Sequence, residues 1–207
     1  MPTTFYIVRH GQSVGNINGD IWGTDPELTP KGIEQAEALA DALQSIHLDH
    51  VIASTRTRAK QTANIIASKK KLPLTEQDRI VERSFGKLEG KKTEEIIQEC
   101  KDLFDRFHTL SLNEQMHWKL VDDMETLDHV RQRAMSLFQE LAKTHNGKTI
   151  LLVTHAHVLL SLLAHFKFVT SMNQLPYGSI QNTAYLKVEH DHGEFIITEV
   201  VGITKKE

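Results

Sequence analysis

The sequence contains a single cysteine, Cys100, among its 207 residues. One cysteine excludes an intramolecular disulfide framework and is typical of a protein from a reducing compartment. No apolar run approaches the roughly 18 residues that a membrane-spanning helix needs, and the N-terminus lacks the charged and apolar regions of a secretion signal. We therefore expect a cytoplasmic location and no membrane contact.

The sequence also lacks an excess of charge of either sign. Its 24 Lys and Arg residues against 27 Asp and Glu residues leave a formal net charge of -3, so nothing indicates a nucleic-acid-binding surface. With 40% hydrophobic residues, the chain is long enough to bury a substantial core. We predict a single domain over residues 1–207, without repeats. The oligomeric state is unknown at this stage, although a C-terminal hairpin would leave a sheet edge open for pairing.

Apolar runs alternate with segments of helical periodicity along most of the chain. This alternation is typical of βαβ units, so we predict an α/β fold: a three-layer α/β/α sandwich with a mostly parallel central sheet. The expected strands are 4–8, 50–54 and 149–153, followed by a hairpin of 183–189 and 194–201. The expected helices are 30–43, 58–68, 94–106, 127–144 and 158–166.

One stretch departs from this alternation. Residues 109–125 show no strong period between two helical segments. We interpret them as part of an insertion and predict a small helical cap over about 91–124. The aromatic residues Trp22, Phe85 and Trp118 are candidates either for a lid over a site or for the core.

Three of the expected strands end in basic residues. Arg9 and His10 follow the first, Arg58 lies shortly after the second, and His155 follows the strand at 149–153. Ligands bind at the carboxyl ends of the strands in an open parallel sheet, so we expect these tips to converge. The pattern predicts an active site that handles an anion.

Phosphomonoester chemistry needs these residue types. Arg9 and Arg58 offer planar forks for phosphate oxygens, and His155 adds positive charge when protonated. A neutral imidazole can attack phosphorus, which makes His10 the candidate nucleophile. A carboxylic acid must protonate the leaving alcohol, and Glu82, in a turn-rich stretch, is the best candidate. The scheme needs no metal and no other cofactor.

Six short motifs follow one another along the chain. They are RHGQSVGN (9–16), LTPKG with a following QA (28–36), STRTRAKQTA (54–63), ERSFGKLEG (82–90), MET (124–126) and LLVTHAH (151–157). With these motifs in this order, the chain resembles the histidine phosphatase superfamily, which has the phosphoglycerate-mutase-like fold. Several independent matches make the resemblance specific, where a lone Arg-His-Gly would be weak.

The resemblance assigns roles to individual positions. It implies that His10 is the phosphorylated nucleophile and Glu82 the proton donor, with a phosphate pocket of Arg9, Arg58 and His155. It further implies that Asn16 is a polar pocket residue and that the main-chain amide of Ala156 faces the phosphate. Arg83, next to the proposed acid, is a candidate substrate contact or a surface ion pair.

The chain departs from the family's pattern in three places. The family commonly has glycines after the second histidine, whereas this chain has Ala156 and His157. His157 either lines the site or is a helix-start histidine bonded to backbone. The family commonly has proline where this chain has Thr55, and Arg56 is unusual beside Arg58, so either arginine could be the phosphate ligand.

Two further carboxylates, Glu89 and Glu125, compete with Glu82 for the role of the acid. A metal hydrolase built on His155 and His157 is another reading, although no partnering carboxylate cluster is obvious. A non-catalytic phosphoester-binding module is a third, against which the intact His10 and Glu82 argue.

Between phosphatase and phosphoglycerate mutase, the composition of the expected cap favours a phosphatase. Residues 101–124 carry only Lys101, Arg106 and Lys119 as cations of Lys or Arg type, without the paired basic residues that would grip a substrate carboxylate. We therefore predict a metal-independent phosphomonoesterase that acts on a small phosphorylated metabolite, a choice of substrate class that follows from the family resemblance.

Overall fold

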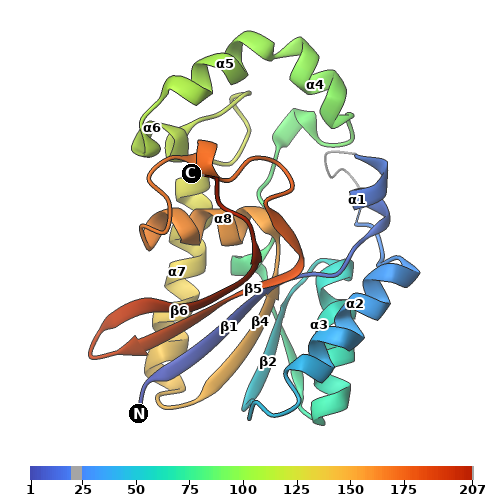
Figure 1. Ribbon diagram of the computed structural model, residues 1–207, viewed down its shortest axis with the longest axis vertical. Helices are drawn as coiled ribbons and strands as arrows, with labels where there is room; N and C mark the ends of the chain where they lie inside the picture. The colour runs from blue at the N-terminus through green and yellow to red at the C-terminus, as the bar shows by residue number, and fades with distance from the viewer. Residues whose placement is uncertain (20–24, 207) are drawn as a thin grey trace.

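The computed structural model describes residues 1–19 and 25–206. Its centre is a six-stranded sheet of order β3-β2-β4-β1-β5-β6, with helices on both faces (Figure 1). The predicted three-layer α/β fold is therefore confirmed. The strands are β1 (Thr3–Arg9), β2 (His50–Ser54), β3 (Leu74–Gln77), β4 (Thr149–Thr154), β5 (Ile180–Asp191) and β6 (Glu194–Ile203).

Strands β1 to β4 run parallel, and β5 and β6 add an antiparallel hairpin at one edge. The five expected strands are found within a few residues of their predicted bounds, but β3 was not predicted. None of its four residues is fully buried, so the stretch has no apolar run to mark it. Pairing with β2 makes it a strand, and that partner is distant in sequence.

Eight α-helices and three short 3₁₀ helices are found in the described part of the chain. They are α1 (Val14–Asn18), α2 (Pro30–Ala42), α3 (Thr57–Lys70), α4 (Thr93–Glu99), α5 (Lys101–Thr109), α6 (Leu112–His117), α7 (Leu127–Thr144), α8 (Ala156–His165), η1 (Asp78–Ile80), η2 (Gly86–Leu88) and η3 (Met172–Gln174). None of these helices combines the length and apolarity needed to cross a bilayer.

The alternation of side chains along β1 divides the core into two. Phe5 and Ile7 pack into the larger cluster, which α7 and α8 complete, whereas Tyr6 and Val8 pack into a cluster with α2 and α3. Successive side chains of a strand point to opposite faces, so a central strand buried on both faces needs a continuous apolar run. This is why the strand before His10 could be recognised from sequence.

The start of α2 packs closely against the loop that follows His10. Thr29 caps the helix by accepting a hydrogen bond from Gly32 N at 3.0 Å, with Pro30 in the first turn, as predicted. The main-chain N–H of Thr29 donates to Gln12 O at 2.9 Å. The helix start thereby holds the backbone that leads from the nucleophile.

We expect Gly32→Ala to destabilise the protein and to disturb the site. A Cβ at position 32 would lie 2.0 Å from Gln12 O, a clash with backbone that only a displacement can relieve. The expected loss is about 1–3 kcal/mol of unfolding free energy, measured by denaturant titration, together with reduced turnover. The neighbouring exposed Lys31→Ala is the control, and equal losses in the two variants would contradict the packing argument.

Helices α4, α5 and α6 occupy the predicted cap segment, and Figure 1 shows them arched beyond one end of the sheet. The prediction of a single helix at 94–106 is wrong in one respect, because the chain forms two helices there, α4 and α5, which meet at Cys100. Ile96 of α4 is buried in a cap cluster with Phe85 and Met124, whereas α5 buries no residue fully. α4 is therefore packed into the cap through a buried residue, whereas α5 lies on its surface.

The stretch without a strong period contains one further helix. α6 begins with a capping box in which the side chain of Ser111 bonds the first turn and Glu114 reaches back to Ser111 N. At the other end of the cap, Thr93 N donates to Gly19 O at 3.0 Å, which joins α4 to the end of α1. The cap is therefore anchored beside the segment that follows His10.

Candidate active site

The three basic strand ends lie together, because β2, β4 and β1 are neighbours in the sheet and run parallel. His10 follows β1, His155 follows β4, and Arg58 lies in the first turn of α3 after β2. The ring centroids of His10 and His155 are 5.2 Å apart, and Arg58 Nε lies 3.0 Å from His10 Nε2. The expected convergence is what the structure shows.

The hydrogen bonds of His10 determine which ring nitrogen carries the proton. Nδ1 lies 2.7 Å from the carbonyl oxygen of Gly11, which only accepts, so Nδ1–H donates. Nε2 then accepts from Arg58 Nε. Burial, with the charges of Arg58, His155 and Arg9, holds the pKa of His10 well below its usual range. His10 is therefore neutral, with the Nε2 lone pair facing the cations.

The two candidate arginines of the second motif differ in environment. Arg58 is 1% exposed and lies in the site, with Nη1 3.7 Å from Asp25 Oδ1. Arg56 is exposed at the N-cap of α3. Asp25 also accepts from Thr57 N at 2.9 Å, which ties the loop after α1 to the start of α3. This geometry favours Arg58 as the phosphate ligand.

Two buried polar atoms beside His10 have no hydrogen-bond partner among the described residues: Arg9 Nε and His155 Nδ1. Arg9 Nη1 donates to the carbonyl of Ile180, which fixes the guanidinium. The Nε2 of His155 lies 2.7 Å from Ser54 Oγ, which orients the ring. Burial and the charge of Arg58 hold the pKa of His155 well below its usual range. A phosphate oxygen would supply the partner that each atom lacks.

The carboxylate of Glu82 is 7% exposed and lies at the start of α8. Its Oε1 accepts from Arg83 N at 2.9 Å and from His157 N at 3.2 Å. Burial by itself would raise the pKa of Glu82, but the imidazole of His157 and then His155 and the Arg83 amide outweigh it and hold the pKa well below its usual range. Glu82 is thus ionised in the free enzyme.

The two competing carboxylates are engaged elsewhere. Glu125 pairs with Arg133 at 2.8 Å and with His129 at 2.7 Å, and it accepts from Ser84 N. Glu89 accepts from the Ser84 hydroxyl at 2.9 Å within its own loop. Of the three candidates, Glu82 is the one whose charge acts on Arg9, Arg58 and His155.

Arg83, a candidate substrate contact, is largely committed to main-chain carbonyls. Its Nε donates to Glu125 O at 2.6 Å and its Nη2 to Trp118 O at 2.9 Å. Burial lowers the pKa of Arg83 to about 10. The side chain therefore joins the loop of Glu82 to the end of the cap, and contact with substrate stays a prediction.

We expect Arg83→Ala to cost about 2–4 kcal/mol of unfolding free energy, because two carbonyl oxygens lose a charged donor. Chemical denaturation measures this loss. Arg79→Ala is the control, since Arg79 forms a surface pair with Glu140 at 2.9 Å, which contributes less than about 1 kcal/mol. If Arg83→Ala instead raises KM at unchanged stability, Arg83 binds substrate and does not anchor the cap.

Asn16 lies in α1, where its Oδ1 accepts from Ser13 N at 3.0 Å and from Asn182 Nδ2 at 3.2 Å. Asn182 also donates to His10 O at 3.1 Å. Sequence reasoning missed Asn182, and it missed Ser54 as the partner of His155. Ala156 is the first residue of α8, so its N–H lies among those that find no acceptor within the helix.

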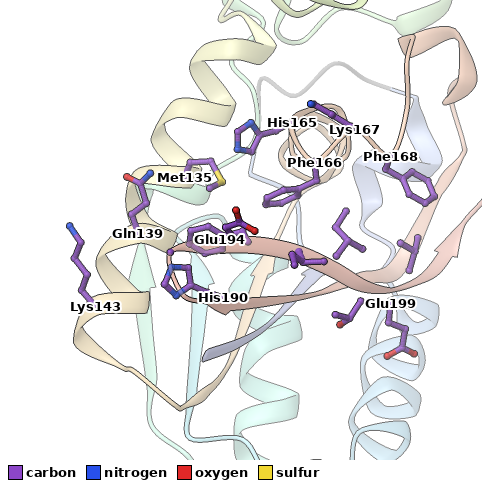
Figure 2. Close-up of a pocket in the computed structure, with 16 residues that line it drawn as sticks. Met135, Gln139, Lys143, His165, Phe166, Lys167, Phe168, His190, Glu194 and Glu199 are labelled. Carbon is purple, nitrogen blue, oxygen red and sulfur yellow. The ribbon is translucent and has the colours of Figure 1, made fainter. Parts of the chain in front are cut away.

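A cleft of about 590 Å³ opens beside Glu82. Arg56 and Lys119 line it together with Glu125 and Arg133. A larger cleft of about 1240 Å³, drawn in Figure 2, lies between the β5–β6 hairpin and the helices α7 and α8. None of the groups around His10 lines that larger cleft, whereas the smaller one is lined by Glu82.

Two of the three aromatic candidates, Phe85 and Trp118, lie within the described residues. Phe85 belongs to the cap cluster, and its ring centroid lies 5.2 Å from that of His157. The guanidinium carbon of Arg106 lies 5.8 Å from the ring centroid of Trp118. Trp22 lies outside the described residues.

Within residues 1–19 and 25–206, no three His, Cys, Asp or Glu side chains gather as a metal site would require. The His155 and His157 pair is therefore without further ligands there.

Comparison with known proteins gives one consistent result. A family model described as the histidine phosphatase superfamily (branch 1) matches residues 5–201. Phosphoserine phosphatase 1 of Hydrogenobacter thermophilus is 33% identical over 150 residues, which is 72% of this chain and 69% of that protein. A 2,3-bisphosphoglycerate-dependent phosphoglycerate mutase of Cytophaga hutchinsonii is 28% identical over 169 residues, or 79% and 77% of the two chains.

Among solved structures, Bacillus stearothermophilus YhfR superposes with a TM-score of 0.84 at 32% identity and covers 98% of both chains.

Proposed function

The chain belongs to the histidine phosphatase superfamily, and on that basis we propose that it hydrolyses small phosphomonoesters without a metal, through a phosphohistidine on His10. The single observation that carries the proposal is the set of buried polar groups gathered with His10. Arg58 Nε reaches His10 Nε2, while Arg9 Nε and His155 Nδ1 lack partners among the described residues. Two buried guanidinium groups and a second imidazole beside a neutral nucleophile suit a phosphoryl group in transfer.

In the first step His10 Nε2 attacks phosphorus and the bond to the leaving oxygen breaks. The electron pair stays on that oxygen, which takes a proton from the carboxyl group of Glu82. Oε1 is held by two main-chain amides, which leaves Oε2 for the transfer. Glu82 is ionised in the free enzyme, so a monoanionic substrate first transfers the proton of its phosphate group to Oε2, and the carboxyl group then passes that proton to the leaving oxygen; the second phosphate pKa is near 6.

In the second step water attacks the phosphohistidine as Glu82 accepts a proton from it. The bond between phosphorus and Nε2 breaks, inorganic phosphate leaves, and the electron pair returns to His10. The hydrogen bond from Nδ1 to Gly11 O keeps the ring in one orientation throughout. Arg9 and Arg58 are permanently charged, so the phosphoryl oxygens are neutralised in both steps.

The cap supports hydrolysis over mutase activity. Lys101 pairs with Asp105, Arg106 stacks on Trp118, and Lys119 donates to Asp122 O at 3.1 Å. These three cations are thus engaged within the cap and do not form a paired grip for a substrate carboxylate. A phosphoglycerate mutase is the alternative, because one of the relatives carries that name.

The test is hydrolysis of a panel of phosphomonoesters in excess chelator, with phosphoserine and 3-phosphoglycerate included and the products identified. We expect release of inorganic phosphate that does not depend on added metal. Conversion of 3- to 2-phosphoglycerate without phosphate release would identify a mutase. No turnover of any ester would favour a binding module and overturn the proposal.

A further inference from the structure

His157 is a titratable residue beside the acid–base carboxylate that the proposed mechanism does not use. Its Nδ1 lies 3.4 Å from Glu82 Oε1, and its main-chain N–H donates to the same oxygen at 3.2 Å. Nδ1 is buried and has no hydrogen-bond partner among the described residues. The ring packs edge-on against Phe85 at 5.2 Å, which restricts its rotation.

We propose that His157 is a positioning residue that holds Glu82 in its ionised form by placing its imidazole and its main-chain N–H on Oε1. This inference rests on the proposed function, in which Glu82 must act as a base in the second step. A carboxylate that is fully buried without a nearby cation favours its neutral form, which could not accept a proton from water. The imidazole opposes that tendency at one oxygen and leaves the other for proton transfer.

Other charged groups also act on Glu82. Arg9, Arg58 and Arg83 act on Glu82 through their fields, and Arg133 Nη2 donates to the main-chain oxygen of Glu82 at 3.3 Å. These arginines are charged at every working pH and also face the phosphoryl group or main-chain carbonyls. His155, the remaining titratable neighbour, is held by Ser54 Oγ at 2.7 Å from its Nε2.

The position of His157 explains why its side chain is suited to this task. It is the second residue of α8, where main-chain N–H groups point toward an anion and the helix dipole favours negative charge. The side chain is 29% exposed, so part of the imidazole faces solvent while Nδ1 lies against the carboxylate. A glycine there, the family's common residue, would keep the amide and remove the imidazole.

The experiment measures the decay of the phosphorylated enzyme against pH, after loading with an aryl phosphate whose leaving group needs no proton. Decay requires ionised Glu82, so its rate falls as the pH drops through the pKa of that carboxyl group. The variants are His157→Gln, whose polar side chain cannot become charged, and His157→Lys, whose side chain is positively charged. His47→Gln is the matched control, because His47 is 86% exposed and pairs with Asp49 at 3.6 Å outside the site.

We expect the acid limb of the decay profile to move about 1–3 pH units upward in His157→Gln. It should stay near the wild-type position in His157→Lys and His47→Gln. Equal shifts in the Gln and Lys variants, or no shift in either, would overturn the inference. His157→Asn serves as a second neutral variant if His157→Gln does not fold. A wild-type protein that hydrolyses nothing and forms no phosphoenzyme would overturn the proposed function itself, an outcome distinct from these.

Discussion

His10→Ala should abolish turnover while leaving the fold intact. The substitution removes His10 Nε2, the atom on which the proposed covalent intermediate forms, and the neighbouring arginines cannot substitute for a nucleophile. We expect kcat to fall by roughly 10³-fold or more, measured as phosphate release from the best substrate of the panel. No phosphoryl group should be retained on the protein.

The loss must be separated from a loss of structure, because His10 is 1% exposed. Its main-chain N–H donates to Thr154 O at 3.0 Å, and this bond between β1 and β4 does not depend on the side chain. The thermal midpoint should therefore stay within a few degrees of wild type. His47→Ala, on an exposed histidine, is the control. Retained turnover in a folded His10→Ala protein would contradict the phosphohistidine mechanism.

Arg58→Ala should reduce kcat/KM far more than Arg56→Ala. Arg58 is buried against His10, and removing it takes a fixed charge and a donor from the site of phosphoryl transfer. The expected loss is about 10²- to 10³-fold, the usual size for one such donor. Arg56 is exposed at the rim of the cleft, so we expect less than about a tenfold change.

Two further measurements test whether Arg58 and not Arg56 binds the phosphoryl group. Arg58→Lys retains the charge without the planar fork, and we expect it to recover part of the activity. Calorimetry measures the affinity for vanadate or inorganic phosphate. We expect this affinity to fall in Arg58→Ala and to stay near the wild-type value in Arg56→Ala. Equal losses of kcat/KM from the two alanine variants would show that both arginines hold the phosphoryl group.

Much of the architecture could be predicted from local patterns. The apolar runs at β1, β2 and β4 mark strands buried on both faces, and their order with the intervening helices specifies a mostly parallel sheet. In such a sheet the strand ends share one edge, which is why His10, Arg58 and His155 could be expected together although they lie far apart in sequence. The edge strand β3 escaped prediction, because its half-exposed residues form no such run.

The choice among chemically equivalent residues could not be read from sequence. Glu82, Glu89 and Glu125 carry the same group, and only their packing separates one beside the histidines from two engaged in ion pairs or loop hydrogen bonds. Asn182 reaches the carbonyl of His10 from β5, across 172 positions of sequence. No local sequence pattern predicts such a contact, because it forms only when β5 pairs with β1.

The sequence by itself thus determined the fold class and the family, and it predicted His10 as the nucleophile, because strand periodicity and short motifs are local properties. The tertiary structure alone decided how charges are paired around them. It placed Arg58 inside and Arg56 outside, joined Ser54 to His155, and set His157 against Glu82. Electrostatic environment depends on distances between elements and on burial, which arise only when those elements pack together.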